Sequence, residues 1–162
     1  MKFKFLTLLI VVALLATSCG NTKKEDKPSS EPIKKETPKQ NSASSKIDLT
    51  APTLENKGIG PIKTIELTAI DDKLVAKGKE LYKTNCTACH KFKKRYIGPG
   101  LKGVTERRSP EWIMNMILNT KEMLENDVVA KALIAEYNAP MAQQQLSKDD
   151  ARAILEYFRT KN

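Results

Sequence analysis

Side chains that bind metals are scarce in this chain, which has one histidine and three cysteines among its 162 residues. A structural zinc site normally needs four closed ligands, mostly cysteine and histidine. Cys19 lies in a leader region, so Cys86, Cys89 and His90 are the ligands left for a folded domain. A carboxylate would have to complete the set, which is uncommon in structural sites. The composition therefore argues against a structural zinc protein.

Long hydrophobic runs are also lacking. Residues 5–16 form a mainly apolar run of twelve residues, preceded by Lys2 and Lys4. At about 1.5 Å per residue this run spans about 18 Å, whereas the hydrocarbon core of a membrane is about 30 Å thick. A basic start, a short apolar run and small residues after it are typical of a secretory signal. Residues 1–18 are therefore predicted to be a signal peptide, and the protein is expected to be exported.

The leader ends at a cysteine. The stretch Leu15-Ala16-Thr17-Ser18-Cys19 resembles a bacterial lipobox. That resemblance implies cleavage before Cys19 and acylation of its side chain; an ordinary cleavage site with an incidental cysteine is the alternative. Several acyl chains give durable anchoring, whereas one gives marginal binding. We therefore expect a lipoprotein on the periplasmic side of the inner or outer membrane of a bacterial cell.

The next segments differ in composition. Residues 19–50 are rich in Lys, Ser, Pro and Glu and have few aliphatic side chains, so a disordered tether is predicted, because such a segment buries too little apolar surface to offset its ordering entropy. Residues 51–70 contain two glycines and two prolines and read as an extended arm. Alternation over residues 63–67 predicts a short strand there. Residues 71–162 are predicted to form the folded domain.

Helical patterns dominate this domain. The apolar spacing predicts a first helix from about Asp71 to Lys83 and a third helix over about residues 121–137. A second helix is predicted to begin at Ser109, which is followed by a proline suited to the first turn. The last helix is predicted to begin at Ser147, because Asp150 completes a capping-box pattern. The expected fold is mainly α, with about four helices.

The chemical signal of the chain is the pentapeptide Cys86-Thr87-Ala88-Cys89-His90. C-x-x-C-H is the attachment sequence of c-type haem: two thiols spaced three apart form thioethers to the porphyrin vinyl groups, and the adjacent imidazole ligates iron. A thioredoxin-like C-x-x-C would need a βαβ setting, whereas the surrounding residues read as helical. We therefore predict one covalent haem c bound by Cys86 and Cys89, with His90 as an iron ligand.

The second axial ligand is sought among the five methionines. Met1 is lost with the leader. Three others occupy helical patterns, where methionine usually fills a core: Met114, Met116 and Met123. Met141 follows Pro140 in a loop between two helices, so its thioether can reach the haem without distorting a helix. Met141 is therefore predicted to be the iron ligand opposite His90, with Met123 as its main competitor. Histidine–methionine ligation raises the reduction potential and leaves iron no open position.

With these residues in place, the chain resembles the monohaem class I c-type cytochromes over about residues 70–162. Gly78-x-x-x-Tyr82, ahead of Cys86, resembles the first-helix pattern of that family, and Tyr157 resembles its last-helix aromatic residue. The resemblance implies that the first and last helices cross closely at Gly78. A glycine inside a helix costs about 1 kcal/mol relative to alanine, which also indicates tight packing.

The family resemblance extends to two loops. Gly98-Pro99-Gly100-Leu101 resembles the loop in which a proline carbonyl accepts a hydrogen bond from the proximal imidazole. This implies that Pro99 orients His90. Met141, just ahead of the final helix, matches the axial methionine of the family. The resemblance thus implies the same two iron ligands that the residue types suggest.

The formal net charge of the chain is +9. A basic balance can indicate nucleic-acid binding, but an exported protein is expected to meet acidic redox partners or lipid head groups instead. Four basic residues follow the haem motif and either surround an exposed haem edge or belong to a generic soluble surface: Lys91, Lys93, Lys94 and Arg95. Arg107 and Arg108 either pair with haem propionates or lie on a solvated face. Trp112 either contacts the haem or fills the core.

These patterns favour an electron-transfer protein of a respiratory chain that is not an enzyme. Its expected partners are redox proteins that donate and accept single electrons, such as a terminal oxidase or a nitrogen-oxide reductase. It is expected to bind no nucleic acid, to meet the membrane through its lipid anchor, and to be a monomer. The alternatives are a haem-based gas-binding or sensor protein and a fixed haem subunit of a larger oxidoreductase.

Overall fold

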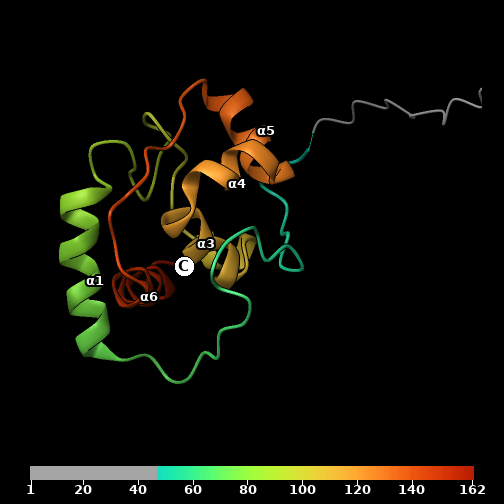
Figure 1. Ribbon diagram of the computed structural model, residues 1–162. Helices are drawn as coiled ribbons and strands as arrows, with labels where there is room; N and C mark the ends of the chain where they lie inside the picture. Colours follow the sequence, from blue (N-terminus) through green and yellow to red (C-terminus); the bar gives the residue numbers. More distant parts are fainter. Residues whose placement is uncertain (1–46) are drawn as a thin grey trace, which may run out of the picture. The chain divides into compact units, whose positions relative to one another are not determined.

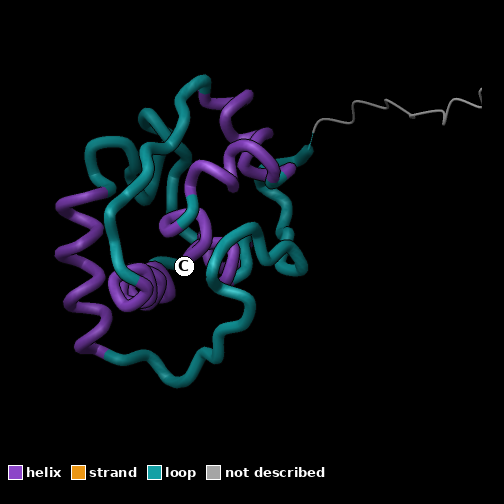
Figure 2. Tube along the Cα trace, in the orientation of Figure 1, coloured by secondary structure: helices purple, strands orange, loops and turns teal. Residues whose placement is uncertain are grey.

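The computed structural model describes residues 47–162 (Figures 1 and 2). Within this stretch the chain forms six helices: α1 (Asp72–Asn85), α2 (Val104–Arg107), α3 (Pro110–Leu118), α4 (Thr120–Asn126), α5 (Val128–Tyr137) and α6 (Lys148–Arg159). The prediction of a mainly α fold is confirmed. Across residues 47–162 no helix is long and apolar enough to cross a membrane. The predicted signal peptide, the lipidation residue Cys19 and most of the predicted tether lie outside the described residues.

The first and last helices cross closely, as the family resemblance implies. In Figure 1, α6 is seen almost end-on beside α1. Gly78 of α1 faces the backbone of Ala153 on α6, with no room for a side chain between them. The rings of Tyr82 and Tyr157 lie 5.7 Å apart, centroid to centroid, at the same crossing. These contacts hold the end of α1, where the cysteine motif begins, against the core.

Two helices begin where the capping patterns predict. The Ser109 hydroxyl accepts a hydrogen bond from the Trp112 N–H at 3.1 Å, and Pro110 occupies the first turn of α3. At α6 the Ser147 hydroxyl accepts from the Asp150 N–H, and the Asp150 carboxylate accepts from the Ser147 N–H. This is the complete capping box, which satisfies two backbone donors that a helix start otherwise leaves unpaired.

The prediction of one helix over residues 121–137 is wrong. Two helices, α4 and α5, occupy this stretch and are separated by Asp127, whose backbone is extended at φ −80° and ψ 129°. The Asp127 carboxylate accepts from the N–H groups of Val129 and Ala130, so it caps α5. Side chains from distant segments also donate to it: Asn56 at 2.7 Å and Trp112 at 3.1 Å. Tertiary hydrogen bonds therefore stabilise the break.

Residues 47–70 comprise the end of the predicted tether (residues 47–50) and the predicted arm (residues 51–70), and together they are called the arm below. They contain turns and bends but no strand, so the predicted strand at residues 63–67 is wrong. The Ile65 N–H donates to the Glu111 carboxylate at 3.2 Å and not to a neighbouring strand. The Asn115 side chain accepts from the Ile62 N–H and donates to the carbonyls of Ile62 and Lys57. The arm is thus attached to α3 mainly through its backbone groups, which side chains of that helix bind.

Candidate haem-binding site

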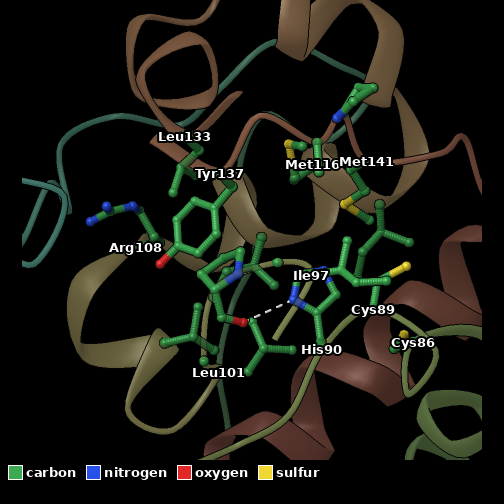
Figure 3. A pocket seen from close by; sticks show the side chains of 18 of the residues that line it. Cys86, Cys89, His90, Ile97, Leu101, Arg108, Met116, Leu133, Tyr137 and Met141 are labelled. Carbon is green, nitrogen blue, oxygen red and sulfur yellow. Dashed lines mark hydrogen bonds between the residues drawn. The ribbon is translucent and has the colours of Figure 1, made fainter. Parts of the chain in front are cut away.

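A mostly apolar pocket lies among the end of α1, the loop at residues 97–101, helices α3 and α5, and the loop at residues 139–144 (Figure 3). Five residues selected from the sequence line it together: Cys86, Cys89, His90, Pro99 and Met141. They come from three separate segments, which only the folded chain brings to one place.

The His90 ring is held from two sides. Its Nδ1 lies 3.0 Å from the Pro99 carbonyl oxygen, the contact drawn as a dashed line in Figure 3. Because a carbonyl can only accept, this hydrogen bond requires a proton on Nδ1, which leaves the Nε2 lone pair available. A Cβ on Gly98 would lie 2.6 Å from Cε1 of the ring, so only glycine fits there. Burial lowers the pKa of His90, although the Pro99 hydrogen bond opposes this, and the neutral imidazole is favoured.

The C-x-x-C-H residues form a tight turn directly after α1. The Cys86 N–H donates to the Tyr82 carbonyl, and the Cys86 carbonyl accepts from the N–H groups of Cys89 at 3.1 Å and His90 at 2.8 Å. The Tyr82 hydroxyl donates to the His90 carbonyl at 3.1 Å. This turn places both thiols and the imidazole on the pocket wall. Burial, followed by the effect of Cys89, raises the pKa of the Cys86 thiol to about 11, whereas Cys89 is exposed.

The methionines separate clearly in the fold. Met141 lines the pocket, on the loop between α5 and α6. Met123, predicted as its competitor, is 0% exposed and does not line the pocket; its Sδ accepts the Ile59 N–H at 3.0 Å. That alternative is therefore wrong, because the arm covers Met123. Met116 of α3 belongs to the hydrophobic core and also lines the pocket, and Figure 3 shows it next to Met141 in this view.

Trp112 and Arg108 both line the pocket, but neither behaves as a solvated surface group. The Trp112 Nε1–H donates to Asp127 at 3.1 Å, so the indole has no donor left for a propionate. Arg108 is 4% exposed, which rules out the solvated-face alternative for this residue. Arg107 is half-buried, and its guanidinium donates to the carbonyls of Lys102 at 2.7 Å and Gly100 at 3.2 Å.

The sequence did not single out the wall that α5 contributes. Leu133, Ile134 and Tyr137 of that helix line the pocket, as do Ile97 and Leu101 of the preceding loop. Leu133 and Tyr137 are spaced four residues apart, which places them on one helix face. That spacing was a usable signal, but the incorrectly predicted continuous helix concealed which face it would present.

Two of the four basic side chains after the haem motif are engaged in contacts within the domain. The Lys91 ammonium donates to the Thr87 carbonyl at 2.7 Å, and Arg95 pairs with Glu136 at 2.7 Å. Lys93 and Lys94 are exposed and have no hydrogen bond from their side chains among the described residues. These two lysines are therefore the members of the cluster that remain available to an acidic partner.

The donor set of the pocket suits a covalently attached porphyrin. Its walls are mainly apolar, two thiols stand at one end, and an oriented imidazole faces into it together with a thioether. Within residues 47–162 no group of three or more His, Cys, Asp or Glu side chains could hold a metal ion by itself. The zinc alternative thus finds no support in the described part of the chain.

Comparison with known proteins gives concordant results. The family model described as cytochrome c matches residues 75–161. A cytochrome c from Rhodothermus marinus is 46% identical, with a TM-score of 0.61, over 62% of this chain and 88% of that protein. An engineered cytochrome c from the same organism, in complex with a carbene intermediate, is 45% identical, with a TM-score of 0.58, over 62% of this chain and 88% of that one. Among curated proteins, no match is found.

Proposed function

The chain is a member of the cytochrome c family and binds covalent haem c, and we propose that it carries single electrons between exported redox proteins, with His90 and Met141 as iron ligands. The observation that carries the proposal is the meeting of Cys86, Cys89, His90 and Met141 at one apolar pocket. When bound, the haem supplies reversible one-electron chemistry between ferric and ferrous iron. The side chains around the pocket determine how the haem is held and how easily its iron is reduced.

His90 is suited to the ligand role because its ring is fixed before any ligand arrives. The Pro99 carbonyl selects the Nδ1–H tautomer and Gly98 packs against the ring, so the Nε2 lone pair of this pocket-lining residue is left available. An orienting hydrogen bond of this kind also makes the imidazole a stronger donor to iron. The ring therefore need not reorganise when the charge on iron changes, which favours fast electron exchange.

Met141 is the proposed opposite ligand because it is a pocket-lining methionine on a non-helical loop. A soft thioether favours ferrous iron and so raises the reduction potential. Leu133 and Ile134 of α5 line the same pocket and add apolar surface to its wall. Burial in an apolar surrounding disfavours the extra positive charge of the ferric state, which acts in the same direction.

Partner recognition is proposed to use the exposed lysines beside the motif. Lys93 and Lys94 are exposed, and the neighbouring Tyr96 is 53% exposed and does not line the pocket, so charge and aromatic surface occur together. Charged residues at the edge of such a surface guide an acidic partner toward the haem pocket and mainly raise the association rate. We expect weak, short-lived complexes with donor and acceptor proteins, and a monomeric carrier.

The proposed location rests on the N-terminal sequence. A basic, apolar leader that ends at Cys19 supports export and lipid anchoring on the periplasmic side of a membrane. A tether of about thirty residues would allow a reach of about 30 Å from the bilayer. The intact mass of the mature protein tests this proposal: acylated Cys19 at the N-terminus supports it, and a mature form without added lipid contradicts it.

The haem proposal is tested in protein purified from cells competent in haem maturation. A pyridine haemochrome spectrum after acid–acetone extraction should show haem that stays with the polypeptide. The ferric protein should show the weak far-red sulfur-to-iron charge-transfer band, and Met141→Ala should abolish that band and lower the potential. Met123→Leu is the control, because Met123 lies outside the pocket and should leave the band in place.

The outcomes of this test separate the alternatives. A five-coordinate iron in the wild type, or a band that persists in Met141→Ala, would contradict Met141 as the ligand; the first result would favour a gas-binding or sensor protein. Constant recovery with a stoichiometric enzyme partner would favour a fixed subunit. The relative that holds a carbene intermediate is an engineered cytochrome c, so its chemistry is not evidence about this chain. We propose that this chain is an electron carrier and not an enzyme.

A further inference from the structure

Arg108 is a buried cation at the edge of the haem pocket. It is 4% exposed and lines the pocket together with His90 and Met141. A charge removed from water is costly unless an opposite charge compensates it. Among residues 47–162, however, no carboxylate forms an ion pair with this guanidinium. Burial, followed by the adjacent Arg107 charge, lowers the pKa of Arg108, and the more distant charges of Asp127 and Asp48 only partly oppose this; arginine nevertheless stays charged in proteins.

Carbonyl groups hold this guanidinium in place without neutralising it. Nη1 donates to the carbonyls of Ala51 at 2.9 Å and Arg107 at 2.7 Å, and Nη2 donates to the Leu49 carbonyl at 2.7 Å. A guanidinium has five N–H donors, so two of them have no partner among the described residues. Arg108 is therefore an oriented positive charge that still has donors for an anion.

The covalent haem brings carboxylates to this pocket. The vinyl groups that form thioethers and the two propionates lie on opposite edges of the porphyrin. In Figure 3, Cys86 and Cys89 lie on one side of His90, and Arg108 lies on the other. Attachment at the cysteines would therefore turn the propionate edge toward the side on which Arg108 lies. We propose that Arg108 is the charge partner of a haem propionate and that residues 47–53 hold it in this position.

The proposal gives the arm a function. The arm precedes residues 75–161, the part of the chain that matches the family model, yet it touches the site directly. Besides the two carbonyls that Arg108 binds, the Thr53 N–H donates to the Arg107 carbonyl at 2.9 Å, and Thr53 and Arg108 form an isolated parallel bridge. A positive charge held beside the haem favours the ferrous state, so the arm would help to set the reduction potential. This inference rests on haem attachment at Cys86 and Cys89 and not on which proteins exchange electrons.

The experiment compares the haem-loaded full chain with Arg108→Gln, Arg108→Lys and Arg107→Gln. Arg107→Gln is the matched comparison, because Arg107 also lines the pocket and carries the same charge, but its guanidinium is half-buried and donates to the carbonyls of Lys102 and Gly100. Haem content is measured first, by pyridine haemochrome. Resonance Raman spectra then report the propionate bending band, which responds to hydrogen bonding of the propionate. Spectroelectrochemistry gives the midpoint potential.

We expect Arg108→Gln to shift the propionate band to lower frequency and to lower the potential, with a smaller band shift in Arg108→Lys because the charge is kept and the planar fork is lost. Arg107→Gln should leave the band in place. If Arg108→Gln yields no folded protein, the band in Arg108→Lys decides. An unchanged band in the Arg108 variants, or an equal shift in Arg107→Gln, overturns the inference while the electron-carrier proposal stands. A wild type without covalent haem overturns both.

Discussion

Gly78 of α1 lies directly against the backbone carbonyl of Ala153 on α6. A Cβ at position 78 would overlap this carbonyl group, and a backbone cannot move aside as the end of a flexible side chain can. The close crossing places Tyr82 against Tyr157 and Phe92, whose ring centroids lie 5.7 Å and 4.7 Å from that of Tyr82. This aromatic cluster supports the turn that carries the cysteines and the histidine.

Gly78→Ala is therefore expected to destabilise the fold by about 2 kcal/mol, because overpacking of this kind costs about 1–3 kcal/mol. Helix propensity alone would stabilise the variant by about 1 kcal/mol, so the sign of the change is diagnostic. Urea denaturation of the haem-loaded protein measures the effect. The control is Ala76→Gly at an exposed position of α1, which should cost about 1 kcal/mol from propensity alone. A stabilised Gly78→Ala variant would contradict the packing argument.

Gly98→Ala is expected to disturb the proposed iron ligand without removing it. The added methyl group would meet the His90 ring, whose Cε1 lies 2.6 Å from the Cβ position. The ring must rotate or retreat, which lengthens its hydrogen bond to Pro99. We expect a lower yield of haem-loaded protein and an altered ferric electron paramagnetic resonance spectrum. Gly100→Ala is the milder control, since its Cβ first meets the Phe92 carbonyl at 3.1 Å. Equal spectra for wild type and Gly98→Ala would argue against this contact.

Asn115 is expected to be a principal attachment point of the arm. Its side chain is fully buried and makes three hydrogen bonds to the backbone of Lys57 and Ile62. Asn115→Ala leaves those backbone groups without partners, at a cost of about 1–3 kcal/mol for each group that stays buried and unsatisfied. We expect a total loss of about 3 kcal/mol and faster proteolysis within residues 47–70.

The comparison for this prediction is Asn119→Ala. The Asn119 side chain makes a single hydrogen bond to the arm, to the Ile59 carbonyl at 3.1 Å, and it is more exposed than Asn115. Asn119→Ala should therefore lower the free energy of unfolding less than Asn115→Ala does, and the arm should be cleaved more slowly than in Asn115→Ala. Proteolysis that starts equally fast in wild type and in Asn115→Ala would show that the arm is held by other contacts.

Glu156 predicts a pH dependence of stability. It is fully buried between Arg152 and Arg159, whose nitrogens lie 3.0 Å and 2.6 Å from its oxygens. Burial alone would raise the pKa of Glu156, but hydrogen bonds from Arg159 and the Asp71 N–H, with the charges of both arginines, lower it overall. A carboxylate with a lowered folded-state pKa stabilises the fold above its unfolded pKa, near 4.5, and this contribution is lost as the pH falls through the folded pKa.

Glu156→Gln should therefore reduce the free energy of unfolding by about 3 kcal/mol at pH 7, since one partner of a buried charged group is removed. As the pH falls below 4.5 and through the lowered folded-state pKa of Glu156, the wild type should approach the variant, because its own carboxyl group becomes protonated. Denaturation at several pH values measures this. Exposed Glu125→Gln is the control and should stay within about 0.5 kcal/mol of wild type. A difference that does not change with pH would contradict the assigned ionisation.

The local features were predictable because their causes lie within a few residues. The C-x-x-C-H spacing, the Ser109 and Ser147 caps, and Gly98-Pro99 act through neighbours in the chain, and the structure places them as expected. The helix break at Asp127 was not predicted. Its stability depends on donors from Asn56 and Trp112, 71 and 15 residues away, and no local pattern signals such partners.

The amino-acid sequence alone indicated the fold class and a covalent haem c, and it predicted the attachment residues and Met141 as an iron ligand, because spacing and residue chemistry are local properties. Only the tertiary structure decided that Met123 is covered by the arm, that α5 walls the pocket, and that Arg108 is a buried cation held by Leu49 and Ala51. These outcomes depend on which backbone carbonyl and N–H groups meet a given side chain. Every residue carries such groups, so a sequence does not distinguish the ones that a distant side chain will bind.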